Sequence, residues 1–242
     1  MSRSPGRSSP ARIAPRSDDT SWSRTGLGFA LVASPFLVLL VGPVAGVTLG
    51  NVLAIALATA VLTRTWRDTR WRRTGLLLGT AFVGTAAGAL LLTAVPTRAL
   101  FVLVGSLAVA AIGIVLAGPS PRLLAGVRGG AVSGALSGFM NTTAGVGGPA
   151  IAMHSIADRW PAPVFVGTAQ AYFLGVNTMS LAFKGFPRLP VAVWVGALAT
   201  LALGIAAGQL LHRHVPASLA RRAVVAIALT GGLATITRGL LM

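Results

Sequence analysis

The sequence contains no cysteine and no glutamate, and its only acids are Asp18, Asp19, Asp68 and Asp158. Without cysteine there is no disulfide framework, no thiolate nucleophile and no metal site with cysteine ligands. Charged residues make up 10% of the chain, whereas a soluble domain carries about 25%. So few charges could not cover the surface of a water-soluble fold. The sequence therefore predicts an integral membrane protein.

The shortage of acids also argues against catalysis. Asp68 and Asp158 fall between the hydrophobic segments, so no segment contains a carboxylate. Intramembrane acid–base chemistry would need a titratable cluster, and carboxylate sites for protons or sodium are missing for the same reason. His212 and His214 flank Arg213 at a spacing seen in metal sites, but no acid or cysteine stands near them. We expect no enzyme activity, no metal site and no cofactor.

Positive charge dominates, with 20 Lys and Arg residues and a formal net charge of +16 at pH 7. Five arginines lie in the first 24 residues and five more between Arg64 and Arg73. Basic clusters that punctuate apolar runs follow the positive-inside rule rather than the pattern of a nucleic-acid-binding face. The expected partner is therefore the lipid bilayer and not nucleic acid. Residues 1–24 are rich in Ser, Pro and Arg, which predicts a disordered basic tail.

The rest of the chain is a series of apolar, charge-free segments. A membrane-spanning helix needs roughly 20 mostly apolar residues, and 54% of this chain is hydrophobic. Proline and glycine residues separate the segments, as helix breakers do. The sequence thus predicts an all-α, polytopic transmembrane bundle. Its segments cover 26–41, 44–63, 74–97, 99–121, 129–157, 160–183, 189–211 and 223–237.

Two parts of the sequence resemble each other. GTAAGALLLTAVP at 84–96 and GIAAGQLLHRHVP at 204–216 share eight of thirteen positions, and an offset of 119 places Asn51 on Gln170. We therefore expect two homologous repeats, 25–121 and 127–242, as in many secondary transporters. The apolar stretch 127–140 would correspond to the polar residues 8–21. The first repeat is thus expected to lack its first half-helix, unless the start of the chain is misassigned.

The stretch 130–155 (GAVSGALSGFMNTTAGVGGPAIAMHS) carries the strongest site signal. Gly134 and Gly138 form a small-residue face suited to close helix packing. The residues after them predict a helix broken within the bilayer, which is tolerated beside protein or a polar cavity. The N-terminus of the second half-helix would offer free N–H groups to an anion. The candidate binding residues there are Asn141, Thr142, Thr143, Gly145, Gly147, Gly148 and Pro149.

The first repeat offers weaker candidates. Thr25, Gly26 and Gly28 stand where the second repeat has its glycine cluster, and Asn51 matches Gln170. All five join the candidate substrate-binding set, because polar groups inside apolar segments usually face the bundle interior.

Three further polar residues leave alternatives open. Asn177 is as compatible with interhelical hydrogen bonding as with substrate contact. His154 could relay a proton or contact an anion, although a lone histidine near a helix end is more often structural. Lys184, the single lysine, is expected to extend its ammonium to the membrane interface.

The segment 130–156 (GAVSGALSGFMNTTAGVGGPAIAMHSI) resembles the second-repeat signature of the sulfite exporter TauE/SafE family of membrane permeases. Residues 25–43 (TGLGFALVASPFLVLLVGP) resemble the end of its first-repeat signature, and the arginine-rich loop 64–73 also fits. The likeness covers about 25–242. It implies a two-repeat helical transporter for small, often sulfur-containing anions such as sulfite or organosulfonates.

These patterns together predict a multi-pass permease of the inner membrane for a small anion, which could form a homo-oligomer. A non-transporting membrane subunit or an incomplete transporter is the alternative. If every segment crosses the membrane, the repeats are parallel; if 127–157 is a re-entrant hairpin, they are inverted. Two short half-helices around a glycine break favour the hairpin.

Overall fold

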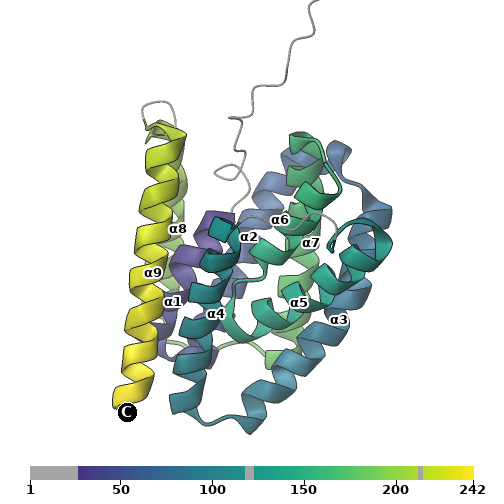
Figure 1. Cartoon of the computed structure of the whole chain (residues 1–242). Coiled ribbons are helices and arrows are strands. Elements are labelled where there is room, and N and C mark those ends of the chain that lie inside the picture. The colour runs from purple at the N-terminus through teal and green to yellow at the C-terminus, as the bar shows by residue number, and fades with distance from the viewer. Residues whose placement is uncertain (1–26, 118–122, 212–214) are drawn as a thin grey trace, which may run out of the picture.

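The computed structural model describes residues 27–117, 123–211 and 215–242, and every regular element in these ranges is helical (Figure 1). The expected all-α architecture is confirmed for this part of the chain. The tail, Thr25, Gly26 and residues 212–214 lie outside the described ranges. The elements are α1 (Leu27–Val41), α2 (Pro43–Thr65), the 3₁₀ helix η2 (Trp66–Asp68), α3 (Trp71–Ala94), α4 (Thr97–Ala117), α5 (Gly126–Ala144), α6 (Gly148–Ala157), α7 (Ala162–Lys184), α8 (Val191–Leu211) and α9 (Ala217–Leu241).

Five helices in the described ranges are long and apolar enough to cross a membrane: Pro43–Asp68, Trp71–Ala94, Thr97–Leu116, Val191–Gly208 and Ser218–Leu241. The other predicted segments differ for physical reasons. α1 has 15 residues, and the segment 129–157 is divided between α5 and α6. α7 has 23 residues but buries polar side chains such as Gln170 and Asn177, which lowers its hydropathy.

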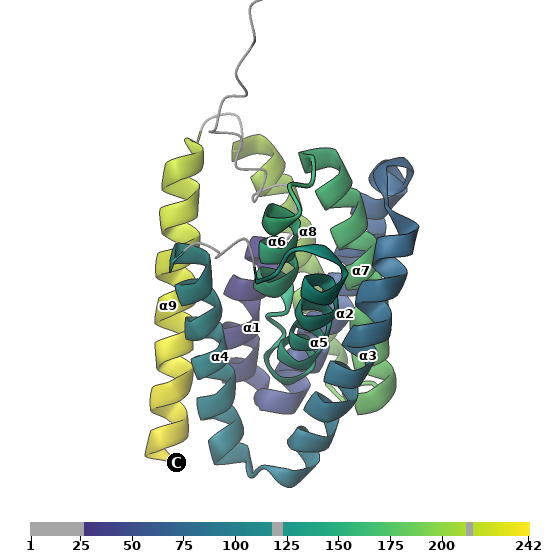
Figure 2. The ribbon, with the colours of Figure 1, turned by 45° about the vertical axis from the view of Figure 1, so that its right-hand side comes forward.

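The α5 and α6 helices form a hairpin that enters the bundle and returns to the same end (Figure 2). Near its open end, the Gly126 N–H donates to the Asp158 carboxylate at 2.7 Å, and His154 Nδ1 donates to the Leu124 carbonyl at 2.7 Å. Deeper in, Ser137 Oγ donates to the Gly147 carbonyl at 2.7 Å. These contacts join the beginning of α5 to the end of α6. The segment is therefore a helical hairpin, as the second of the two predicted arrangements requires.

A left-handed glycine makes the turn at the tip of the hairpin. Gly145 has φ 71° and ψ 13°, a conformation that costs other residues about 1–2 kcal/mol. Its N–H donates to the Asn141 carbonyl at 2.9 Å, and the Val146 N–H donates to the Met140 carbonyl at 3.3 Å. This closure satisfies carbonyls at the end of α5 and lets the chain reverse within the bundle.

Close glycine contacts hold α5 against α3. A Cβ atom on Gly138 would lie 2.9 Å from Ala81 Cα, and one on Gly84 would overlap the Ala135 carbonyl. Such approaches between backbones are the reason for small residues at helix interfaces in membranes. The packing interpretation of Gly134 and Gly138 is confirmed.

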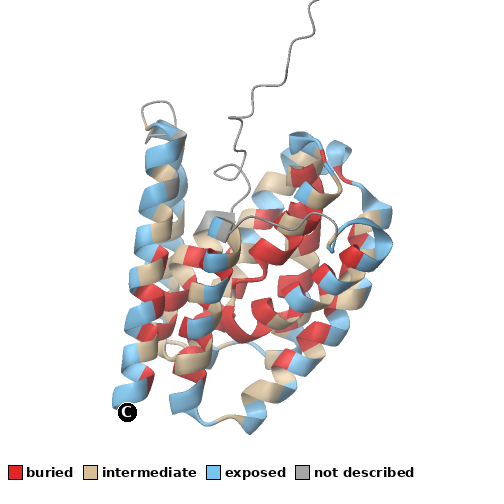
Figure 3. Cartoon of the chain, viewed as in Figure 1, coloured by how far each residue is buried: buried red, intermediate tan, exposed pale blue. Residues whose placement is uncertain are grey.

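Many large apolar side chains are exposed, while the buried residues gather around the hairpin and α7 (Figure 3). Leu90 on α3 and Leu203 on α8 are 70% and 71% exposed. No residue of the window Val191–Gly208 in α8 is buried. Exposed leucines on spanning helices are what a lipid environment stabilises, so the surface agrees with a multi-pass membrane protein.

Candidate functional site

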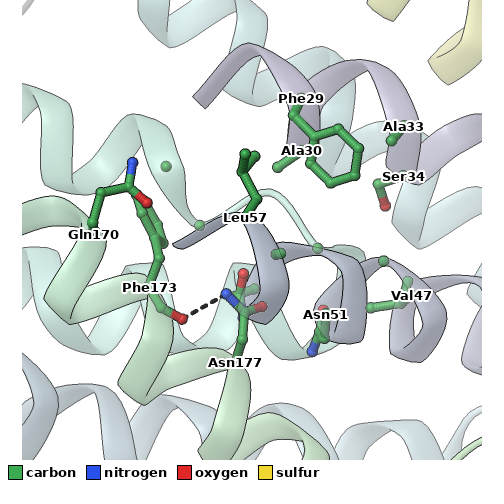
Figure 4. Close-up of a pocket in the computed structure, with 16 residues that line it drawn as sticks. Phe29, Ala30, Ala33, Ser34, Val47, Asn51, Leu57, Gln170, Phe173 and Asn177 are labelled. Atoms are coloured by element: carbon green, nitrogen blue, oxygen red, sulfur yellow. Dashed lines mark hydrogen bonds between the residues drawn. The ribbon is translucent and has the colours of Figure 1, made fainter. Parts of the chain in front are cut away.

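A cavity of about 40 Å³ lies where α1, α2, α7 and the tip of the hairpin meet (Figure 4). This is room for about three water-sized groups, at roughly 10–15 Å³ each. Among the described residues that line it, there is no carboxylate. The structure brings together half of the residues that the sequence analysis selected, namely Asn51, Asn141, Gly145, Gly147, Gly148 and Gln170.

Three described candidates of the second repeat, Thr142, Thr143 and Pro149, do not line the cavity. Thr142 and Thr143 turn towards α3, because a Cβ atom on Gly88 would lie 3.2 Å from Thr142 Cβ and 3.3 Å from Thr143 Cγ2. Pro149 is buried in the first turn of α6. Gly28 lies in the first turn of α1, beside Phe29, which lines the cavity.

The break in the helix lies later than the polar triplet. Asn141, Thr142 and Thr143 are all helical and form the last turn of α5, and the chain leaves the helix at Gly145. The Thr143 hydroxyl donates to the Phe139 carbonyl at 2.7 Å, a contact within the helix. The three polar residues therefore form the last turn of α5, and Gly145 is the residue at which the helix ends.

Three amides converge at one side of the cavity. Asn141 Nδ2 donates to Asn177 Oδ1 at 3.1 Å, and Asn177 Nδ2 donates to the Phe173 carbonyl at 2.7 Å. Figure 4 shows Asn177 beside Asn51, with Phe29 and Leu57 at the other side. Asn177 thus makes the interhelical hydrogen bond of the first interpretation, and it also lines the cavity.

The orientation of the Asn51 amide follows from its neighbours. With the nitrogen towards the Val47 carbonyl at 2.9 Å, the oxygen accepts from Ser180 Oγ at 2.6 Å and from Lys184 Nζ at 3.2 Å. The opposite orientation lets Asn51 Nδ2 face Ser180 Oγ but sets the amide nitrogen beside a cationic donor, so we assign the first. An amide nitrogen carries two hydrogens. The hydrogen bonds described for Asn51, Asn141 and Asn177 use one on each.

The N-terminus of α6 completes this side of the cavity. Gly147 and Gly148 line it, and Pro149 has no N–H to offer. The first N–H groups of a helix have no partner within the helix. In the described part of the chain, those of Gly147, Gly148 and Ala150 make no backbone hydrogen bond outside α6. Together with the positive end of the helix dipole, these N–H groups favour a negative ligand.

The comparison with protein families agrees with this geometry. The model of the family "Sulfite exporter TauE/SafE" matches residues 23–235, from before α1 into α9. The chain belongs to the sulfite exporter TauE/SafE family. Membership makes it a membrane transporter of the exporter type, in a family of transporters rather than enzymes. No curated protein and no solved structure matches the chain.

A charged cluster closes the open end of the hairpin in this TauE/SafE protein. Arg73, at the start of α3, forms an ion pair with Asp158 in the turn after α6. Its guanidinium also lies 5.2 Å from the centre of the Trp160 ring. Burial opposes ionisation of Asp158, but the Gly126 N–H, Arg73 and the nearby His154 together lower the pKa of its carboxyl below the ordinary value of 3.8. Arg73 and Asp158 are 85 residues apart, and no sequence pattern pairs them.

His154 belongs to this structural cluster. The residue is buried, and its Nδ1 is occupied by the Leu124 carbonyl. Its Nε2 lies 4.0 Å from the Asp158 carboxylate. His154 does not line the cavity, so the structural interpretation is the one its contacts support.

Lys184 is placed differently from the expectation. Its ammonium turns into the bundle and donates to the Thr142 carbonyl at 3.2 Å instead of extending to the interface. Side chains on a helix lean towards its N-terminus, and the carbonyls at the end of α5 provide acceptors within reach. The sequence feature that could have indicated this position is that the single lysine ends a helix containing the amides Gln170 and Asn177.

Proposed function

We propose that this TauE/SafE protein carries a small, sulfur-containing oxyanion of the sulfite or organosulfonate class across the inner membrane. The observation that carries the proposal is the convergence of three amides and the α6 N-terminus on one cavity without a lining carboxylate. Amide and backbone N–H groups bind oxyanions without needing a counter-cation. The small volume of the cavity suits a compact anion.

Alternating access between two inverted repeats is the mechanism that we propose. α2 and α7 both have 23 residues and begin 119 positions apart, at Pro43 and Ala162. They run antiparallel, because Gly167 of α7 packs against Thr65 of α2, while Ser180 hydrogen-bonds Asn51. α4 and α9 begin 120 positions apart and pair in the same antiparallel manner. Such pairing supports a two-fold axis in the membrane plane, with the site at the repeat interface.

The hairpin is the element suited to move. Its tip contacts α1 through a hydrogen bond from the Ser34 hydroxyl to the Ala144 carbonyl, while Arg73 and Asp158 hold its open end. Movement of the tip against α1 and α2 would open the cavity to one side while the base stays closed. We propose this movement as the transport step.

The test is uptake of radiolabelled sulfite by vesicles that contain the purified protein. We expect uptake above that of protein-free vesicles and loss of it in Gly147→Leu, because a Cβ atom there would lie 2.6 Å from the Ser137 carbonyl oxygen and displace the tip. Gly79→Leu is the matched control, since no atom lies within 4 Å of that position. Monodispersity in detergent checks that both variants insert and fold.

The alternative of a non-transporting membrane subunit gives a different result. Wild-type vesicles would then take up neither sulfite nor a simple sulfonate such as methanesulfonate. Uptake that Gly147→Leu leaves at the wild-type level would remove the hairpin from the mechanism.

A further inference from the structure

The side chain of Lys184 occupies an unusual place for a cation in a membrane protein. The residue ends α7, yet its ammonium lies 3.2 Å from the Thr142 carbonyl and 3.2 Å from the Asn51 amide oxygen. Thr142 and Asn51 are 0% and 1% exposed. The charge is therefore held against buried groups beneath the hairpin tip. A charge in such a place is costly, and its retention points to a role.

No carboxylate in the described part of the chain balances this charge. Asp158 pairs with Arg73, and Asp68 lies in η2, directly after α2. Both acids lie at the opposite end of α7, because Gly167 near its start packs against Thr65 and Thr69. The 23 residues of α7 place that end about 35 Å from Lys184, at roughly 1.5 Å per residue. The acceptors that the structure describes at the ammonium are two neutral oxygens, those of the Thr142 carbonyl and the Asn51 amide.

Lys184 also continues the polar face of α7 that lines the cavity. Gln170, Phe173 and Asn177 line it at helical spacings of three and four residues. Ser180 and Lys184 follow at the same spacings on the same face. The Asn51 amide joins the two parts, because it lines the cavity and also accepts from both Ser180 and Lys184. This polar face of α7 thus extends from the cavity to the C-terminal end of the helix.

We infer that Lys184 is an anion-binding residue on the side of the pathway away from the Arg73–Asp158 base, where it takes over the oxyanion when the hairpin tip moves. This inference rests on the proposed transport function. In the present conformation, the Thr142 carbonyl occupies the position of the anion at the ammonium. Displacement of the tip would remove that carbonyl, and a sulfite or sulfonate oxygen would replace it. A charged hydrogen bond to the anion exceeds one to a neutral carbonyl in strength.

A purely structural role is the competing explanation, because a cation near the end of α5 also interacts favourably with the helix dipole. The two roles of Lys184, anion binding and capping of α5, predict different results. An anion-binding lysine sets the sulfite concentration that half-saturates transport, whereas a helix cap sets thermal stability alone.

The test compares Lys184→Met and Lys184→Arg in the sulfite uptake assay, with Arg188→Met as a control for lost charge at an exposed position beyond the same helix end. For Lys184→Met we expect the half-saturating sulfite concentration to rise about tenfold or more, the loss of one charged hydrogen bond. Lys184→Arg should stay within about threefold of wild type, as should Arg188→Met. An unchanged half-saturating concentration in Lys184→Met overturns the inference, whatever the melting temperature does.

A second variant covers the case in which Lys184→Met does not fold. The chain has no cysteine, so Lys184→Cys carries the only thiol and can be modified after assembly. Aminoethyl methanethiosulfonate restores an ammonium and should recover high-affinity uptake, whereas the neutral methyl reagent should not. Equal uptake after both reagents overturns the inference. If the wild-type protein shows no uptake at all, the proposed function fails instead.

Discussion

The Gly126 N–H donates to the Asp158 carboxylate at 2.7 Å, so that the first residue of α5 is tied to the turn after α6. The same carboxylate pairs with Arg73 of α3. The Asp158 side chain thereby connects both helices of the hairpin, α5 and α6, to α3. These interactions fix the open end of the hairpin. The tip is held separately, by its contacts with α1, α2 and α7.

Asp158→Asn should lower the melting temperature of the purified protein. The variant keeps an oxygen for Gly126 but loses the charge that pairs with Arg73. We expect a loss of about 1–2 kcal/mol, limited by solvent screening because the Arg73 side chain is 39% exposed. Asp68→Asn is the control, since Asp68 is exposed in η2 and should change stability little. Equal melting temperatures for wild type and Asp158→Asn would contradict this role.

The stabilisation by Asp158 should vanish in acid. Its pKa is lowered in the folded protein from the ordinary value of 3.8. The ionised form is therefore favoured by folding, and its contribution is present above pH 3.8 and lost as the pH falls through the lower folded value. The difference in melting temperature between wild type and Asp158→Asn should stay constant from pH 7 to about pH 5 and shrink below pH 3.8. A difference that grows in acid would show the opposite sign of linkage.

Asn141→Asp should abolish sulfite uptake while the protein stays monodisperse in detergent, although the carboxylate no longer donates to Asn177 Oδ1. The two side chains have the same shape, but the carboxylate would place negative charge on the wall of the cavity. Juxtaposition of like charges costs several kcal/mol. Thr143→Val is the matched control from the same helical turn, because Thr143 faces α3 and bonds only within α5. Uptake should be near normal in this control, and equal loss in both variants would point to a general defect.

Gly84→Val should prevent folding, whereas Gly204→Val should be tolerated. Both glycines open the same Gly-x-Ala-Ala-Gly sequence. A Cβ atom on Gly84 would overlap the Ala135 carbonyl, while nothing lies within 4 Å of that position on Gly204. Overpacking costs about 1–3 kcal/mol in most cores and occasionally more, and here the overlapping atom is a backbone oxygen that cannot turn aside. Yield and monodispersity in detergent provide the comparison, and similar behaviour of the two variants would refute the packing described for α3 and α5.

A disulfide between positions 34 and 145 should stop transport reversibly. A Cβ atom on Gly145 would lie 3.3 Å from Ser34 Cβ, close to the separation in disulfides. The double variant Ser34→Cys, Gly145→Cys would then fix the hairpin tip to α1. Uptake should be lost on oxidation and return on reduction, while Ser34→Cys alone should not respond. Normal uptake by the oxidised double variant would show that the tip does not move.

Much of the site follows from local chemistry. A helix that ends at Ala144 and begins again at Gly148 leaves backbone groups without helical partners, and such a break persists in a bilayer only beside protein or water. The structure places a cavity there. The offset of 119 selected Asn51 and Gln170 as a pair, and both residues line that cavity.

The polar triplet shows the limit of this reasoning. Asn141, Thr142 and Thr143 have the same sequence signal, but successive residues of a helix point about 100° apart. Only Asn141 can therefore face the cavity, while its two neighbours face α3. The sequence located the turn of helix, and packing selected the side chain.

The amino-acid sequence by itself determined the membrane environment, the helical architecture, the break after α5 and the family, because hydropathy and backbone hydrogen bonding act over short stretches of chain. The tertiary structure alone decided the pairing of Arg73 with Asp158, the inward turn of the Lys184 ammonium and the different surroundings of Gly84 and Gly204. These features depend on contacts between segments far apart in the chain. Their energies arise only when the helices pack, so no local pattern encodes them.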